Sequence, residues 1–254
     1  MKKIAFIFTS LVLVCLSISC EFFSKPLYRF SRDISGVIGS MSTADLAGNV
    51  DKLSSDPKIA ADVLNELANR PQDEVSNLSK EDKEKLLNAG VSAILPVSQL
   101  GDMVEQLTKG DGDMDFATIM DSLSQGGASV NTKALETILE DENILKTTDA
   151  STLAFSAASL IVNTVKTEVG DSSSFEDKMT AFQDVAKNVN GSFDKENFAT
   201  QLEAKGFTAE SASALSAAMG VADILTGERK DDAAGVGIGG FTISDLLDKM
   251  KGGQ

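Results

Sequence analysis

The sequence predicts an all-α fold, a multi-helix bundle of roughly nine to eleven helices. Three observations predict it: from Ser42 onward apolar residues recur at intervals of three and four, helix-start signals precede these runs, and the alternation typical of strands is hardly seen. With 42% apolar and 24% charged residues, the chain of 254 residues can form a hydrophobic core. We therefore expect an all-α domain over residues 42–227, with a candidate sub-boundary in the polar loop at residues 170–174.

Two helices near the start of this domain have clear start signals. Asp56 and Pro57 combine an N-cap with a proline at the first helical position. Ser79 and Asp82 form a capping box in which aspartate replaces the usual glutamate. We expect each helix to end near the next proline. The apolar stripes are Ile59, Ala60, Val63, Leu64 and Leu67 in the first helix, and Leu86, Leu87, Val91 and Ile94 in the second.

The region from residue 100 to residue 139 contains three more apolar stripes at helical spacing. Glycines at Gly110 and at Gly126-Gly127 separate them, and Asn131 is the expected N-cap of the third helix. The stripes are Leu100, Met103, Val104 and Leu107, then Phe116, Ile119, Met120 and Leu123, then Leu135, Ile138 and Leu139.

The segment from Thr148 to Val169 is apolar around most of its circumference. Such a helix is usually the buried centre of a bundle. Its Asn163 and Lys166 argue against a membrane span. After the polar loop, further helices are expected over residues 175–189, 194–205 and 208–225.

An internal echo runs through the helical region. Gly90 begins the string GVSAIL and Gly220 begins GVADIL, and each follows a helix-start signal, Ser79 or Thr208, by a similar interval. Thr148 opens a third comparable helix between them. Weak internal repeats from a duplication, or chance similarity between alanine-rich helices, would explain the echo. Its period of about 60 to 70 residues exceeds that of the common helical repeats.

The C-terminal region is predicted to be a linker followed by a helix. Residues 228–240 are charged and glycine-rich, and they lack both the strand-to-helix context of a dinucleotide fingerprint and the Gly-Lys-Ser/Thr of a phosphate loop. Thr242 is the expected cap of an amphipathic helix within residues 241–254. This helix could dock on the helical body or on a partner protein. Its apolar face consists of Ile243, Leu246, Leu247 and Met250.

The first 19 residues have the pattern of an export signal. Two lysines precede an apolar run at residues 4–16, which is shorter than the roughly 20 residues that span a bilayer, and small residues follow. Ser19-Cys20 then resembles the lipobox of bacterial lipoproteins, although Leu16 lies one position earlier than the usual leucine. The resemblance covers residues 1–20 and implies that Cys20 becomes the lipidated N-terminus. An ordinary secretory cleavage nearby is the alternative, but it would leave a lone thiol without a partner or remove the cysteine.

Residues 20–41 are predicted to be a tether. Part of this tether is rich in aromatic and basic residues, whereas the remainder of the chain is acidic. The stretch 21–32 carries three basic side chains and one acidic side chain, Glu21, which gives a net charge of +2 (3 − 1). Aromatic side chains favour the membrane interface and basic ones favour anionic headgroups. This stretch, which we call the strap, could therefore lie on the bilayer or pack on the folded domain. It consists of Phe22, Phe23, Lys25, Tyr28, Arg29, Phe30 and Arg32.

The composition excludes several kinds of chemistry. The chain has no histidine, and its two cysteines are Cys15 in the signal and Cys20. Ser-His-Asp, Cys-His and histidine-based zinc sites are therefore excluded for this chain acting alone. No spacing of other residue types indicates a catalytic pair, so we expect the protein to have no enzymatic activity and no cofactor. Loss of the two signal lysines changes the net charge from −15 to −17 (−15 − 2), which disfavours nucleic-acid binding.

Asp111, Asp113 and Asp115 alternate like the start of a calcium-binding loop, where carboxylates converge on a hard cation. The rest of the loop departs from that pattern, because Phe116 stands where the turn needs glycine and Ser122 where a bidentate glutamate is needed. A solvated acidic turn in which Asp115 caps the next helix is the preferred interpretation. A calcium site at the three aspartates is the alternative.

These observations predict a noncatalytic lipoprotein of the bacterial cell envelope. Its N-terminal lipid would hold it at a membrane, and its acidic helical body would offer a helical face to a protein partner. The alternative function is a carrier of a lipid or other apolar ligand, in which the central alanine- and valine-rich helices enclose a cavity.

Overall fold

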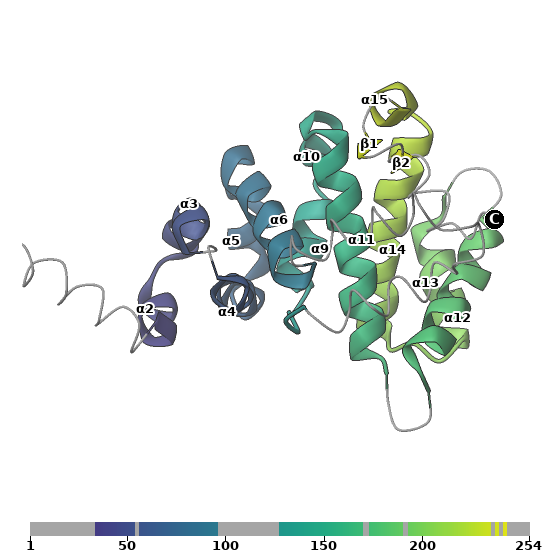
Figure 1. The fold of residues 1–254 in the computed structure, drawn as a ribbon, viewed down its shortest axis with the longest axis horizontal. Coiled ribbons are helices and arrows are strands. Elements are labelled where there is room, and N and C mark those ends of the chain that lie inside the picture. Colours follow the sequence, from purple (N-terminus) through teal and green to yellow (C-terminus); the bar gives the residue numbers. More distant parts are fainter. Residues whose placement is uncertain are drawn as a thin grey trace, which may run out of the picture. The chain divides into compact units, whose positions relative to one another are not determined.

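The structure is a computed structural model that describes residues 34–53, 56–95, 127–169, 173–189, 193–234, 237–238 and 241–242. It confirms the all-α fold: these residues form twelve helices and one pair of two-residue strands (Figure 1). The chain divides into two compact units between Met41 and Ser42. Helix α2 (Ile34–Ser40) belongs to the first unit, and the other elements described belong to the second.

The described part of the second unit contains eleven helices and a small antiparallel ladder. In that ladder Gly237 pairs with Thr242 and Ile238 with Phe241. The elements are α3 (Thr43–Leu53), α4 (Pro57–Ala68), α5 (Gln72–Ser76), α6 (Lys80–Ile94), α9 (Lys133–Leu139), α10 (Glu142–Thr147), α11 (Ala150–Thr167), α12 (Phe175–Lys187), α13 (Lys195–Ala204), α14 (Ala209–Thr226), α15 (Lys230–Ala234), β1 (Gly237–Ile238) and β2 (Phe241–Thr242).

Three long helices, α6, α11 and α14, lie side by side in chain order (Figure 1). Shorter helices pack on this row: α4 on α6, α9 on both α11 and α14, and α13 on α14. Helix α3 packs on α4 and α6 at one end of the row, while α12 contacts α11 and α13 near the other. Helix α11 therefore lies at the centre of the unit.

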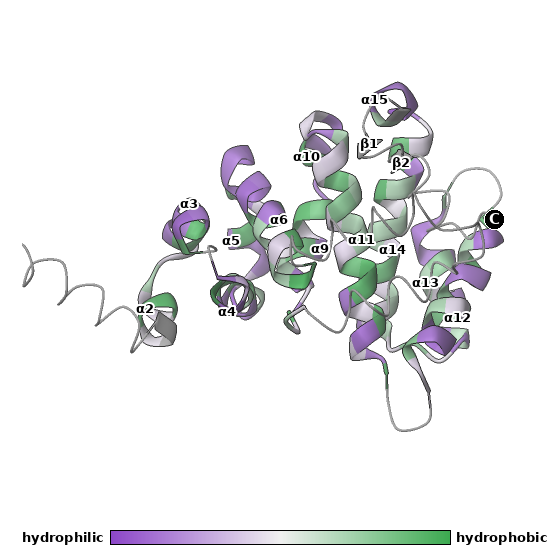
Figure 2. Cartoon of the chain, viewed as in Figure 1, coloured by the Kyte–Doolittle hydropathy of each residue, from purple (hydrophilic) through white to green (hydrophobic). Residues whose placement is uncertain are grey.

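The central position of α11 follows from its composition, as the sequence predicts. Apolar residues surround the helix, so that it can bury side chains against α6, α9 and α14 at once. Figure 2 shows the contrast between α11, which is largely hydrophobic along its length, and α15, which is largely hydrophilic. None of the described helices combines the length and the apolar character that crossing a membrane requires.

The three long helices begin with side-chain caps. The Ser79 hydroxyl accepts a hydrogen bond from the Asp82 N–H (3.1 Å), and the Thr208 hydroxyl accepts one from the Ser211 N–H (3.3 Å), as predicted. The third cap is one residue later than predicted, because Asp149 rather than Thr148 accepts from the first turn of α11. Caps of this kind typically stabilise a helical protein by about 1 kcal/mol each.

The two glycines of the sequence echo both lie beneath a neighbouring side chain. A Cβ added at Gly90 in α6 would come within 2.8 Å of a Leu135 methyl group, and one added at Gly220 in α14 would lie 3.6 Å from the Phe193 ring. Gly90 thus lets α9 approach α6 more closely than a side chain would allow, whereas the space at Gly220 would accommodate a Cβ. A duplication behind this echo stays a prediction.

Gly127 lies directly against the C-terminal end of α6. The Ala128 N–H donates to the Ala93 carbonyl (3.0 Å), and the Lys166 ammonium donates to the Gly127 carbonyl (3.0 Å). A Cβ at Gly127 would lie only 2.0 Å from the Ile94 carbonyl oxygen. Two backbone segments therefore touch here with no space for a side chain.

The stretch predicted as a linker, residues 228–240, differs from that expectation in its first half. Residues Lys230–Ala234 form α15, which contacts α14 and α11. The guanidinium of Arg229 binds the Leu145 carbonyl (2.7 Å) and the Thr148 carbonyl (2.8 Å), and these bonds hold the start of the stretch on the helical unit. A long-range contact of this kind leaves no local signal in the sequence.

One lysine is buried where three helices meet. Lys83 in α6 is 4% exposed, and its ammonium group donates to the Ser76 carbonyl at the end of α5 (2.6 Å) and to the Asp141 carboxylate that caps α10. The pKa of Asp141 lies below its usual value of 3.8, mainly because its carboxylate accepts the hydrogen bond from Lys83. Burial acts in the opposite direction but is outweighed. The pair therefore joins α5, α6 and α10.

Replacing Lys83 with methionine should lower the free energy of unfolding by about 3 kcal/mol at neutral pH, because the Asp141 charge and the Ser76 carbonyl lose their partner. The folded-state pKa of Asp141 is depressed, so this stabilisation is present above pH 3.8 and is lost as the pH falls through the lower folded-state value. The difference between wild type and K83M should accordingly narrow on acidification. Urea unfolding followed by circular dichroism at neutral and acid pH measures both effects.

The matched control is Lys146→Met, which removes an exposed lysine paired with Glu142 four residues earlier. Exposed pairs of this kind contribute little to stability, so this variant should unfold like wild type. Equal stability of K83M and K146M would contradict the proposed role of Lys83.

Candidate functional site

All the site residues predicted from the sequence lie outside the described residues. They are Cys20, the strap residues Phe22, Phe23, Lys25, Tyr28, Arg29, Phe30 and Arg32, the aspartates Asp111, Asp113 and Asp115, and the terminal face Ile243, Leu246, Leu247 and Met250. Lipidation, the calcium site and the partner face therefore stay predictions.

The described residues contain a polar cleft that the sequence did not predict. Its volume is about 490 Å³, a size that accommodates a small molecule. The C-terminal half of α11, the segment 129–132, the side of α4 and the N-terminal turn of α14 enclose it. Eleven of its twelve lining residues are polar, and the lining is Asn65, Ser129, Val130, Asn131, Thr132, Asn163, Thr164, Thr167, Glu168, Thr208, Glu210 and Ser211.

Asn163 fixes one wall of the cleft. Its side chain is 1% exposed, and the amide nitrogen donates to the Val130 carbonyl (2.7 Å) while the amide oxygen accepts from the Val130 N–H (3.0 Å). A single side chain thus pairs with both backbone groups of Val130, as a neighbouring strand would. Because both groups are buried, this pair of hydrogen bonds holds the segment 129–132 against α11.

Another part of the lining is held by Glu168, which follows the last residue of α11. Its carboxylate accepts hydrogen bonds from the N–H (3.1 Å) and the hydroxyl (2.5 Å) of Thr208 at the start of α14, and the Lys178 ammonium lies 3.8 Å away. Burial would raise the pKa of the Glu168 carboxyl, but the hydrogen bonds from Ser211 and Thr208, with the charge of Lys178, outweigh burial and lower it. Glu168 is therefore a carboxylate at neutral pH that caps α14 from outside the helix.

Four groups on the cleft wall make no hydrogen bond or ion pair to any residue that the structure describes. They are the amide nitrogens of Asn65 and Asn131, the Thr132 hydroxyl and the Glu210 carboxylate. The Asn65 amide oxygen accepts from the Asn131 N–H (2.7 Å), which orients the Asn65 side chain. The cleft thus presents donors and acceptors on a framework fixed by Asn163 and Glu168.

The lining of this cleft is suited to binding polar groups. Within the ranges that the structure covers, no three histidine, cysteine, aspartate or glutamate side chains are grouped so that they could hold a metal ion. The lining residues include no histidine or lysine, and the Thr208 hydroxyl donates to the Glu168 carboxylate. The donors and acceptors of the cleft can bind a ligand.

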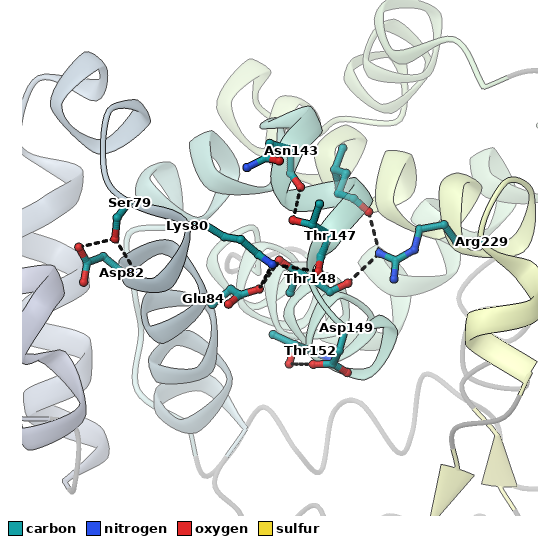
Figure 3. A network of polar contacts seen from close by, with 11 residues as sticks. Ser79, Lys80, Asp82, Glu84, Asn143, Thr147, Thr148, Asp149, Thr152 and Arg229 are labelled. Carbon is teal, nitrogen blue, oxygen red and sulfur yellow. Dashed lines mark hydrogen bonds and ion pairs between the residues drawn. The ribbon is translucent and has the colours of Figure 1, made fainter.

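A second polar cluster lies at one end of the long helices (Figure 3). There Arg229 donates to the carbonyls of Leu145 and Thr148, and Lys80 donates to the carbonyl of Thr147 (3.1 Å). The Thr148 hydroxyl donates to the Glu84 carboxylate (2.9 Å) in α6. Both cations satisfy carbonyl groups that the end of α10 leaves without helical partners. We therefore assign this cluster a structural role, which is to join α6, α10, α11 and α15.

One signal in the sequence could have found the cleft. Asn163 directly follows the apolar run from Leu160 to Val162 in α11, and a buried amide needs hydrogen-bond partners. Its partner, the Val130 backbone, is 33 residues away, and Asn65 and Glu210 come from still more distant helices. The pattern indicates that a polar contact exists at Asn163, but it does not say which segment makes it.

Comparisons with known proteins add no relative from which a function could be carried over. No protein-family model matches the chain, and no curated protein and no solved structure is significantly similar to it.

Proposed function

We propose that the protein is a lipoprotein of the bacterial cell envelope, anchored through lipid on Cys20, whose all-α body is a noncatalytic protein-interaction or scaffold module. The observation that carries the proposal is the short apolar export-type segment that ends in Ser19-Cys20. A lipidated cysteine followed by a basic aromatic strap gives two membrane signals, which together hold a protein more stably than one.

The helical body supports the interaction role. Its long helices bury a continuous set of apolar side chains, and its buried polar groups such as Asn163 and Lys83 are engaged in joining segments. A well-packed body of this kind can present its acidic outer surface to a partner with little rearrangement. The partner we expect is another protein with a complementary, basic surface.

The polar lining of the cleft does not favour the alternative, a carrier of a lipid or other apolar ligand. Val130 is the one apolar residue among the twelve that line it. An acyl chain in this cleft would desolvate amide, hydroxyl and carboxylate groups without giving them hydrogen bonds, which is unfavourable.

Replacing Cys20 with alanine should move the protein from the membrane fraction to the soluble fraction and abolish its labelling by radioactive palmitate, because the acylated side chain is lost. Fractionation followed by immunoblotting, with labelling in growing cells, measures both results. Cys15→Ala is the matched control, since this cysteine lies within the signal and should leave with it. A C20A protein that has lost its signal but stays membrane-bound would overturn lipid anchoring and make the Phe22–Phe30 strap the anchor.

The interaction role is tested in the same cells by crosslinking. The wild-type protein should yield a specific crosslinked partner, and the soluble C20A protein should yield less of it, because anchoring concentrates the protein at the membrane. Recovery of abundant bystanders alone, in equal amounts from both proteins, would count against a scaffold role.

A further inference from the structure

We propose that the polar cleft between α4, α11 and α14 binds a neutral, hydroxyl-rich small molecule, a sugar or polyol. This inference is independent of lipid anchoring and adds a ligand to the proposed interaction role. It starts from the lining, in which eleven of twelve residues carry amide, hydroxyl or carboxylate groups. Such groups can pair with ligand hydroxyls as both donors and acceptors.

The charge of the lining disfavours anionic ligands. Glu168 and Glu210 line the cleft, and no lysine or arginine is among the lining residues. The ammonium group of Lys178 lies 3.8 Å from the Glu168 carboxylate, so this pair is close to neutral as a whole. A phosphate or carboxylate in the cleft would meet the charge of Glu210 without a cationic partner. A neutral ligand that donates hydroxyl hydrogen bonds to Glu210 has no such penalty.

The polar groups of the cleft wall that have no hydrogen-bond partner among the described residues can make the contacts to this ligand. The Asn65 amide nitrogen is a donor that the hydrogen bond from Asn131 holds in place, and Thr132 at the start of α9 has a hydroxyl that makes no capping bond. Among the lining residues, Thr164 is 2% exposed and its hydroxyl oxygen makes no hydrogen bond to any described residue. A buried polar atom without a partner is rare, and a polar group that reached this oxygen would satisfy it.

The lining also indicates a modest affinity. It includes no aromatic side chain on which a sugar ring could stack, so the binding energy rests on hydrogen bonds that replace those to water. We expect dissociation constants of about 1 mM, corresponding to a small net gain from several hydrogen bonds. At high concentration sugars also stabilise proteins by exclusion from the surface, and a matched variant must separate the two effects.

The test uses the full-length protein in a detergent without a sugar headgroup, with N-acetylglucosamine and methyl glucoside as neutral probes and glucose 6-phosphate as the anionic probe. Saturation-transfer NMR and thermal unfolding report binding. The neutral sugars should bind and raise the melting temperature, and the phosphate sugar should bind at least about tenfold more weakly because of Glu210.

Two conservative variants locate the site. Asn65→Asp keeps the oxygen that accepts from Asn131 but replaces the donor, and Thr132→Val removes a hydroxyl that caps nothing. Each should weaken binding about tenfold, the value for one lost hydrogen bond. Asn197→Ala, at an exposed site on α13, is the control and should bind like wild type.

Three outcomes overturn the proposal: no saturation transfer from either neutral sugar, equal stabilisation of wild type and both cleft variants, or stronger binding of the phosphate sugar. The second outcome would assign the stabilisation to solvent exclusion. None of them bears on Cys20, so failure of this proposal is distinguishable from failure of lipid anchoring.

Discussion

Replacing Gly127 with alanine is expected to lower the free energy of unfolding by about 3 kcal/mol, and the melting temperature by about 6 to 12 °C for a chain of this length. The added Cβ would lie 2.0 Å from the Ile94 carbonyl oxygen and 2.8 Å from its carbonyl carbon. Both atoms belong to the backbone at the end of α6, so no side-chain rotation can relieve the contact. Thermal and urea unfolding followed by circular dichroism measure the loss.

Gly48→Ala is the matched control for this prediction. Gly48 lies in the interior of α3, where an added Cβ would meet the Asp82 carboxylate at an ordinary contact distance of 3.8 Å. Because alanine is the better helix former by about 1 kcal/mol, this variant should be as stable as wild type or more so. If G127A were as stable as G48A, the close approach of Gly127 to α6 would be wrong.

Replacing Asn163 with aspartate should destabilise the protein by about 3 kcal/mol at neutral pH. The carboxylate still accepts from the Val130 N–H, but its second oxygen faces the Val130 carbonyl, which loses its donor in a buried position. Burial raises the pKa of the new carboxyl. As the pH falls through that raised value, the carboxyl becomes protonated and can donate to Val130 again, so the deficit should shrink.

Unfolding in urea as a function of pH measures this recovery. The K83M deficit also narrows on acidification, but for a different reason: there the wild-type protein loses the stabilisation of the Lys83–Asp141 pair, whereas here the N163D variant regains a hydrogen bond. Asn197→Asp, in the exposed first turn of α13, is the control and should show no deficit at neutral pH. An N163D protein with an equal deficit at every pH would show that the hydrogen bonds to Val130 do not hold the segment.

The fold class could be predicted because its signals are local. Apolar spacing identifies the long helices, and the caps at Asp56, Ser79 and Thr208 form between residues two or three positions apart. Prediction was less accurate where a distant residue intervened. Thr148 was expected to open α11, but its hydroxyl donates to Glu84, 64 residues earlier, and Asp149 caps the helix instead.

The cleft could not be predicted for the same reason. Its walls come from four parts of the chain, and only their packing brings them together. These parts lie around Asn65, around Val130, around Asn163 and around Thr208. Helical periodicity states which face of each helix is buried, but not which helix covers it. A single buried amide such as Asn163 indicates that a polar contact is made there, but the sequence does not show which residue is its partner.

The contact of Gly127 with the end of α6 has a consequence for the evolution of the chain. Leu95 and Gly127 bound residues 96–126, and the bond from Ala128 to Ala93 brings the two ends of that stretch together. Because residues 93 and 128 are bonded directly, the position of the segment that leads into α9 is fixed against the end of α6 by the two ends of the stretch themselves. Evolution should therefore retain glycine at position 127 wherever this backbone contact is retained, since any larger residue would force the two segments apart.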